Sequence, residues 1–339
     1  MAAARPYLAL DDHRQRWVRS IKAGTHLGLT ALILCLCQNV FIIRLPLEYR
    51  RGVNAHGTWI LPRVASGLTN SIRGLPKHFR SLTSFNLAAT YGGRILEKQG
   101  RVDSFAPFMK LKALKKLSLL GLFFRSLGNA PWLSTPCNIT NIELYNCQLA
   151  EQQANRLYKF CSELNKVKFH YGPSVYCNDV RPQLAMVVNS LNAHAPRLQC
   201  LEISIPCPTA HHVHTANPIR FEWPTQLKEL HLHTPILFPH PKIQPVKIIL
   251  PAMLEKLMLS CMTTVHLDCL AKNHSKILEM LPKLKELHLD DPLSFEERLD
   301  GLRDLFAVGN VAVIATGVEL IEFINGIKVD ENGVRTQMW

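Results

Sequence analysis

A six-residue pattern, apolar-x-x-apolar-x-apolar, recurs ten times along the chain and constrains the fold more than any other feature of the sequence. Self-similarity at a step of this length indicates a stack of structural repeats, in which each unit buries its apolar face only against its neighbours. The steps between first positions are 42, 32, 25, 25, 34, 29, 27, 30 and 34 residues. The copies begin at Val40, Leu82, Leu114, Ile139, Leu164, Leu198, Leu227, Leu254, Leu284 and Val318.

The second half of each copy predicts a short strand. Residues at alternate positions of a strand face the same side, so the last two apolar residues of a copy enter the core and the residue between them faces out. The copy at Ile139 continues to Cys147 and Leu149, which match the leucine-rich-repeat consensus at its Asn-or-Cys position and beyond. We expect Cys147 to lie in the turn after the strand, where backbone groups must be satisfied internally.

Helical spacing of apolar residues occupies several segments between these strands. It predicts helices over residues 151–161, 181–194 and 273–280, and prolines at 196 and 282 separate the last two from the following strand. The expected fold is therefore α/β: a leucine-rich-repeat solenoid, or horseshoe, with irregular repeats of mostly 25–34 residues and parallel strands on its concave face. The solenoid is expected over residues 38–325, with a C-terminal tail at 326–339.

Residues 1–37 form a basic segment that is expected to end in a capping helix over residues 14–37, because a terminal repeat needs a cover for its apolar end. The stretch from Leu27 to Ile43 contains no charged residue and follows four basic ones, so it resembles a signal anchor. Its 17 residues are short for a membrane span, and a buried helix that runs into a strand is the preferred interpretation. A membrane-anchored repeat protein is kept as an alternative.

Composition indicates a folded protein with an excess of positive charge. The formal net charge is +13, with basic residues scattered in pairs and without a run of five or more. This leaves open a repeat protein that binds nucleic acid or another anionic surface, although neither nucleic acid nor a membrane is the expected partner. The ten cysteines include no CxxC pair, which favours a reduced cytoplasmic or nuclear compartment.

The sequence contains no motif of a known catalytic or cofactor site. It has no P-loop, GxGxxG or GxSxG element. His211, His212 and His214 are the densest group of possible metal ligands, and His231 and His233 alternate on one predicted strand, but no CxxC or HExxH accompanies them. We therefore expect a non-catalytic protein with no metal and no cofactor.

The residues between the two strand leucines are the candidate partner-binding residues, because stacked strands align their outward positions into one surface. Their mixture of charges and polar groups is typical of a protein-binding surface rather than a phosphate-binding one, which would concentrate Arg and Lys. Trp59, Trp132 and Trp223 lie between strands, where they could anchor a partner or pack beneath loops. The candidates are Arg44, Asn86, Ser118, Glu143, Lys168, Glu202, His231, Met258, His288 and Glu322.

The chain resembles the leucine-rich-repeat region of fungal F-box-type proteins. The resemblance covers about residues 40–323 and rests on CQNVFIIRL at 37–45, on Cys147, and on APRLQCLEI at 195–203 and LPKLKELHL at 281–289. It implies a protein that holds the substrate of a ubiquitin ligase, whose adaptor docks on an N-terminal F-box. That box, with its Leu-Pro opening and acidic helix, is not found in residues 1–22, and Leu45-Pro46 lies within the first repeat. A protein-recognition scaffold whose partner is unknown is thus the first hypothesis.

Overall fold

The computed structural model is an α/β protein built on one open, ten-stranded, all-parallel sheet. The sheet order is β1-β2-β3-β4-β5-β6-β7-β8-β9-β10, so each strand pairs with its neighbours in sequence. The order is compatible with a solenoid-like fold. The structure describes residues 11–22, 26–37, 39–48, 79–90, 106–109, 111–121, 137–147, 149, 151–171, 181–204, 221–237, 250–260, 262, 264–290, 296–316, 322–324, 327–329 and 335–337.

Nine of the ten predicted strands are confirmed as members of this sheet. Each of these nine copies contributes its final residues to the paired segment, and in the eight copies from Leu82 to Leu284 all three apolar positions are buried. The strands are β1 (Ile42–Glu48), β2 (Ser84–Thr90), β3 (Lys116–Leu120), β4 (Asn141–Tyr145), β5 (Lys166–His170), β6 (Cys200–Ser204), β7 (Glu229–His233), β8 (Lys256–Ser260), β9 (Glu286–Asp290) and β10 (Ala312–Thr316).

The tenth copy was assigned to the wrong segment. The prediction placed a strand at residues 318–323, but β10 is Ala312–Thr316, with Ile314 opposite His288 of β9. Residues 310–315 occupy the hexad positions, with Asn310 where an apolar residue was required and Ala315 at the last position, so the pattern did not detect them. Glu322 belongs instead to β11 (Glu322–Ile324), which forms a separate antiparallel sheet with β12 (Ile327–Val329) and β13 (Arg335–Gln337).

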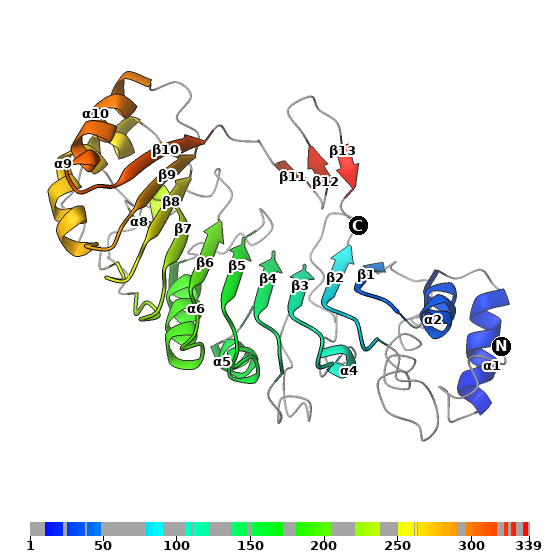
Figure 1. Ribbon diagram of the computed structural model, residues 1–339. Helices are drawn as coiled ribbons and strands as arrows, with labels where there is room; N and C mark the ends of the chain where they lie inside the picture. The colour runs from blue at the N-terminus through cyan, green and yellow to red at the C-terminus, as the bar shows by residue number, and fades with distance from the viewer. Residues whose placement is uncertain are drawn as a thin grey trace.

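Helices cover one side of the sheet. Figure 1 shows the ten strands along an arc, with α5 (Glu151–Phe160), α6 (Arg181–His194), α9 (Thr264–Met280) and α10 (Glu296–Ala307) on its outer side. Two short helices, α4 (Ala106–Met109) and α8 (Thr234–Leu237), complete the described connections. The predictions for α5 and α6 are confirmed, whereas α9 begins nine residues before the predicted start at 273.

The core lies between the sheet and these helices. Apolar residues of successive strands stack in register, as Leu144, Phe169 and Ile203 do, and the buried residues of α5 and α6 belong to the same core. On α5 the buried residues include Ala154, Leu157 and Tyr158. Because each strand contacts the strands on either side, the apolar core is continuous along the arc.

The turn after β4 confirms the predicted role of Cys147. Its side chain is buried, and its Sγ lies 3.3 Å from the carbonyl oxygen of Leu119 and 3.4 Å from that of Tyr145. The thiol can therefore donate to a carbonyl group of the neighbouring repeat where the chain leaves the strand.

The N-terminal region differs from the single buried helix that the sequence predicted. Two helices, α1 (Asp11–Lys22) and α2 (His26–Leu36), precede β1, and the apolar side chains of Leu29, Ile33 and Leu36 are exposed. The apolar run is therefore only partly covered. Within the described residues, no helix combines the length and the hydropathy that crossing a membrane requires.

We predict that Leu201→Ala lowers the free energy of unfolding by about 3 kcal/mol, because it leaves a cavity at a fully buried position in the middle of the sheet. Denaturation by urea measures the loss, and Val308→Ala, at a position with 85% exposure, is the control. A Leu201→Ala protein as stable as the control variant would contradict this packing.

Candidate binding surface

The side of the sheet away from the helices presents three parallel rows of side chains, which we call the open face. Its middle row contains nine of the ten predicted binding residues, and the strand register brings each of them opposite the next. In the tenth position the structure places Ile314, an exposed residue, instead of the predicted Glu322. The row reads Arg44, Asn86, Ser118, Glu143, Lys168, Glu202, His231, Met258, His288 and Ile314.

Two flanking rows were not among the predicted residues, although the same alternation extended by two positions would have indicated them. The row at the start of the strands includes Lys116, Lys166, Glu229, Lys256 and Glu286. The row at their carboxyl ends includes Tyr145, His170, Ser204, His233, Ser260 and Asp290.

Glu143 on β4 is held by residues of the preceding strand. Its carboxylate accepts a hydrogen bond from Ser118 Oγ at 2.7 Å and lies 2.8 Å from Lys116 Nζ. Burial alone would raise the pKa of Glu143, but the hydrogen bonds from Lys116 and Ser118 and the nearby positive charges lower it below its ordinary value of 4.5. The carboxylate is therefore ionised and fixed in position at neutral pH.

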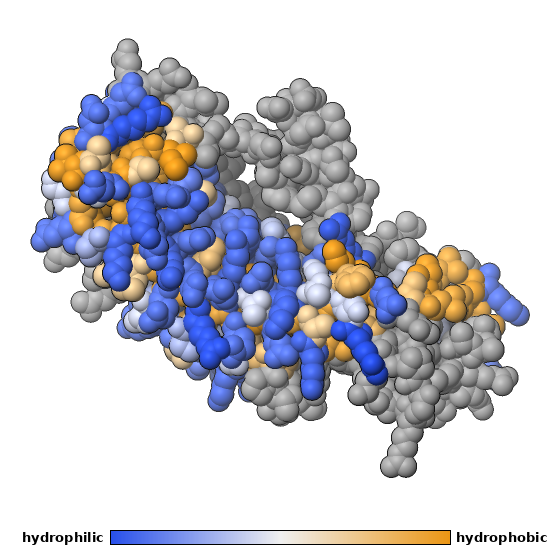
Figure 2. Space-filling view, viewed as in Figure 1, coloured by the Kyte–Doolittle hydropathy of each residue, from blue (hydrophilic) through white to orange (hydrophobic). Residues whose placement is uncertain are grey.

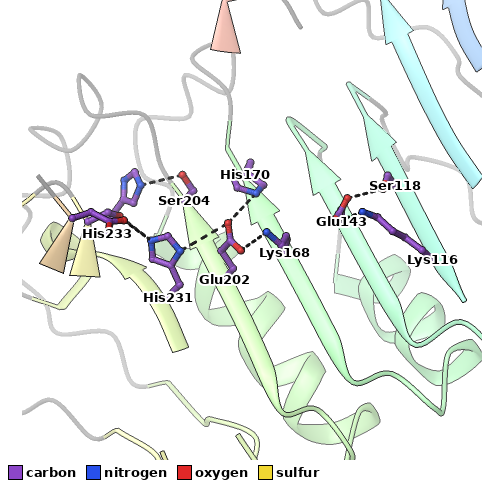
Figure 3. Close-up of polar contacts among 11 residues, drawn as sticks. Lys116, Ser118, Glu143, Lys168, His170, Glu202, Ser204, His231 and His233 are labelled. Carbon is purple, nitrogen blue, oxygen red and sulfur yellow. Dashed lines mark hydrogen bonds and ion pairs between the residues drawn. The ribbon is translucent and has the colours of Figure 1, made fainter. Parts of the chain in front are cut away.

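Glu202 on β6 is the centre of a second cluster, drawn in Figure 3. Its carboxylate oxygens lie 2.6 Å from Lys168 Nζ, 3.3 Å from His170 Nε2 and 3.9 Å from His231 Nδ1. Burial works against its ionisation, but the hydrogen bond and charge of Lys168 lower its pKa below 4.5. Three strands, β5 to β7, thus converge on one carboxylate.

The two histidines beside Glu202 are neutral at neutral pH. Burial lowers the pKa of His170 from 6.5 to about 4, and it also lowers that of His231, although Glu202 attracts a proton to both. His170 Nε2 is buried and makes no hydrogen bond with Glu202. Because the ring is neutral at neutral pH, the 3.3 Å contact between the two side chains is not an ion pair there. The His170 ring stacks on Tyr145, with the ring centroids 4.5 Å apart and the planes at 5°.

Hydrogen bonds between histidines and serines continue the cluster across β6 to β8. His233 Nε2 lies 3.0 Å from Ser204 Oγ, and His231 Nε2 lies 3.2 Å from Ser260 Oγ. Glu202, His231 and Ser260 follow the order of a hydrolase triad. The 3.9 Å from the carboxylate to His231 Nδ1 is beyond hydrogen-bond reach, however, and Asp290 lies 3.8 Å from the Nε2 that faces the serine. These contacts do not form a hydrogen-bonded catalytic relay.

The open face does not gather the elements of a metal site or a phosphate site. Among the described residues, no group of three or more His, Cys, Asp or Glu side chains is arranged to hold a metal ion. The amino groups of Lys116, Lys168 and Lys256 each lie within 3.4 Å of a carboxylate oxygen. Positive charge on this part of the face is therefore already compensated by neighbouring strands.

The other candidate metal ligands and tryptophan anchors do not add to the open face as the structure describes it. His211, His212, His214, Trp59 and Trp132 lie outside the described residues. Trp223 is buried and packs against Phe221, with the ring centroids 4.9 Å apart, so it contributes to the core rather than to an exposed binding surface.

Comparison with models of known protein families and with curated proteins found no match to this chain.

We predict that stability falls as the pH is lowered from 6.5 to about 4. The unfolded chain binds a proton at His170 within this window and the folded chain does not, so folding becomes less favourable as protons are added. The change in the free energy of unfolding from this residue is on the order of 2 kcal/mol. Urea denaturation at the two ends of the window measures it.

The variant His170→Phe, which can keep a ring stacked on Tyr145, is expected to flatten this pH dependence. His194→Phe, at the end of α6 and away from the cluster, is the matched control and is expected to leave the slope unchanged. An equal slope in wild type and His170→Phe would exclude His170 as its source.

Proposed function

We propose that this chain is a leucine-rich-repeat protein, with a horseshoe-shaped solenoid, that binds another protein on its open face and has no catalytic activity. The observation that carries the proposal is the open face itself, a continuous surface contributed by ten consecutive strands in one register. The hexad supports the leucine-rich assignment, because all three of its apolar positions are buried in the eight copies from Leu82 to Leu284 and Cys147 fills the consensus turn position.

The fixed geometry of the face favours recognition. Glu143 and Glu202 are held by partners on adjacent strands, and their side chains are only 15% and 16% exposed. A partner that meets such a surface does not have to order these side chains on binding, which lowers the entropic cost of association. On β8 and β10, Met258 and Ile314 supply apolar contact area, and Glu229 on β7 supplies an exposed charge.

A protein partner agrees better with this face than nucleic acid does. Phosphate binding needs lysines and arginines that are free to replace counterions, whereas the lysines nearest the centre of the face are paired with carboxylates. A partner surface with both charge signs and some apolar area would complement the rows.

The more specific role that we propose is that of the substrate-binding part of an F-box-type ubiquitin ligase receptor. Its support is the resemblance of residues 40–323 to the repeats of fungal F-box-type proteins. We propose a cytoplasmic or nuclear location, which agrees with the free thiols of Cys37, Cys137, Cys147, Cys161, Cys200 and Cys269.

Affinity purification of the tagged chain, followed by quantitative mass spectrometry, tests the role of the face. We expect Glu229→Arg combined with Met258→Arg to reduce the recovery of the bound protein by about tenfold or more, because both side chains lie on the open face and neither is buried. Glu279→Arg, an exposed charge reversal on α9, is the matched control and is expected to leave recovery unchanged.

The outcome also distinguishes the proposed partners. Recovery of a cullin adaptor together with a protein that is lost in the open-face variant supports the ligase role. Recovery that is equal in all three chains argues against the open face as the binding surface. Binding that disappears with nuclease or with rising salt would instead favour nucleic acid.

A further inference from the structure

The N-terminal end of the protein carries a cluster of exposed apolar side chains. On α2, Leu29, Ile33 and Leu36 are 42%, 58% and 60% exposed, and at the start of β1 Phe41 and Ile42 are 61% and 52% exposed. Five of the eight large apolar side chains that are exposed in the described residues lie in this short stretch. We call these five residues the N-terminal apolar patch.

The patch is distinct from the face that attaches α2 to the protein. Leu29, Ile33 and Leu36 follow helical spacing and form one stripe. Ala31 on the same helix is completely buried, and Leu32 packs against the core that also contains Trp17 of α1. The helix therefore packs one side against the apolar core and presents a second apolar side outward.

Exposed basic residues flank the patch on both sides in the sequence. No aspartate or glutamate occurs from residue 13 to residue 47, a stretch that contains Arg14, Arg16, Arg19, Lys22 and Arg44. Of these, Arg19, Lys22 and Arg44 are exposed in the structure. Figure 2 shows the apolar surface of α2 beside hydrophilic surface at the same end of the molecule.

An apolar surface flanked by exposed cations matches the interface of an anionic lipid bilayer, where side chains enter the acyl boundary and cations remain at the headgroups. We propose that the N-terminal apolar patch docks the protein on the surface of an anionic membrane. Because α2 has eleven residues, a length of about 17 Å, it lies on the bilayer and does not cross it.

Charge also distinguishes this partner from a second copy of the chain. Two patches brought together would place the cations of both copies close to one another, which opposes association. An anionic membrane attracts the same cations. The proposal does not depend on protein binding by the open face, and the two surfaces can be tested separately.

Vesicle flotation with the full-length chain tests the proposal, using vesicles of phosphatidylcholine alone and vesicles that also contain phosphatidylserine. We expect binding only to the phosphatidylserine vesicles, with a partition coefficient reduced about tenfold or more by Ile33→Asp. Arg19→Glu combined with Lys22→Glu is expected to weaken binding similarly, and rising salt weakens it in the wild type. The control Val308→Asp introduces the same charge at an apolar residue that is even more exposed, at 85%, in the turn after α10.

Four results would overturn the proposal. The first is that Ile33→Asp and the wild type partition equally onto vesicles. The second is that the wild type binds equally to vesicles with and without phosphatidylserine, and the third is that it stays on membranes after an alkaline wash, which indicates a span. The fourth is that sedimentation analysis shows a dimer that Ile33→Asp dissociates, while neither chain binds vesicles. Thermal melting of each variant, compared with the wild type, identifies any loss that comes from unfolding.

Discussion

A ladder of backbone hydrogen bonds at the start of the strands sets the register on which every surface of this protein depends. The carbonyl oxygen of Lys115 accepts the amides of both Thr140 and Asn141, and that of Thr140 accepts those of Asn165 and Lys166. The carbonyl at the second hexad position accepts two backbone amides in the same way in each copy from the one that contains Phe41 to the one that contains Glu255. Backbone amides make this ladder, and the hydroxyls of Thr83 and Thr140 add side-chain hydrogen bonds to two of its carbonyls. Most side chains at these positions can therefore vary, while the apolar residues of the hexads remain fixed by burial.

Because burial fixes only the apolar positions of each hexad, those positions decided which strands could be predicted from the sequence. Where the hexad begins with leucine or isoleucine, the residue is buried and its strand was found, as at Leu198. The last strand keeps its place in the ladder through the amide of Ala312, which donates to Lys285, but Asn310 stands at its first position. The buried Val311 and Val313 supply its core contacts. Val313 keeps its hexad position, but the first apolar residue is displaced by one position to Val311, so a search for the hexad missed this strand.

Nine of the ten residues in the middle row followed from alternation, but their interactions did not. Alternation places Lys168 and Glu202 on the same side of their strands, whereas their 2.6 Å contact requires that β5 and β6 pair in one particular register across 34 residues of sequence. The neutral state of His170 was still less predictable. It arises because the ring is covered by Tyr145 and its neighbours, and sequence spacing does not report burial of that kind.

The net charge of +13 does not make every surface of the protein attractive to anions, because the charges are unevenly distributed. On the open face, cations and carboxylates neutralise each other between adjacent strands, so most of its electrostatic field is local. At the N-terminal end, 35 residues contain basic side chains and no acidic one, and the exposed apolar residues lie among them. Attraction to anionic partners is thus expected at the N-terminal end, whereas the recognition that we propose for the open face would depend on shape and on paired charges. The two proposed binding surfaces therefore differ in chemistry and lie at the end and along the length of one sheet, so we expect no competition between the partners proposed for them.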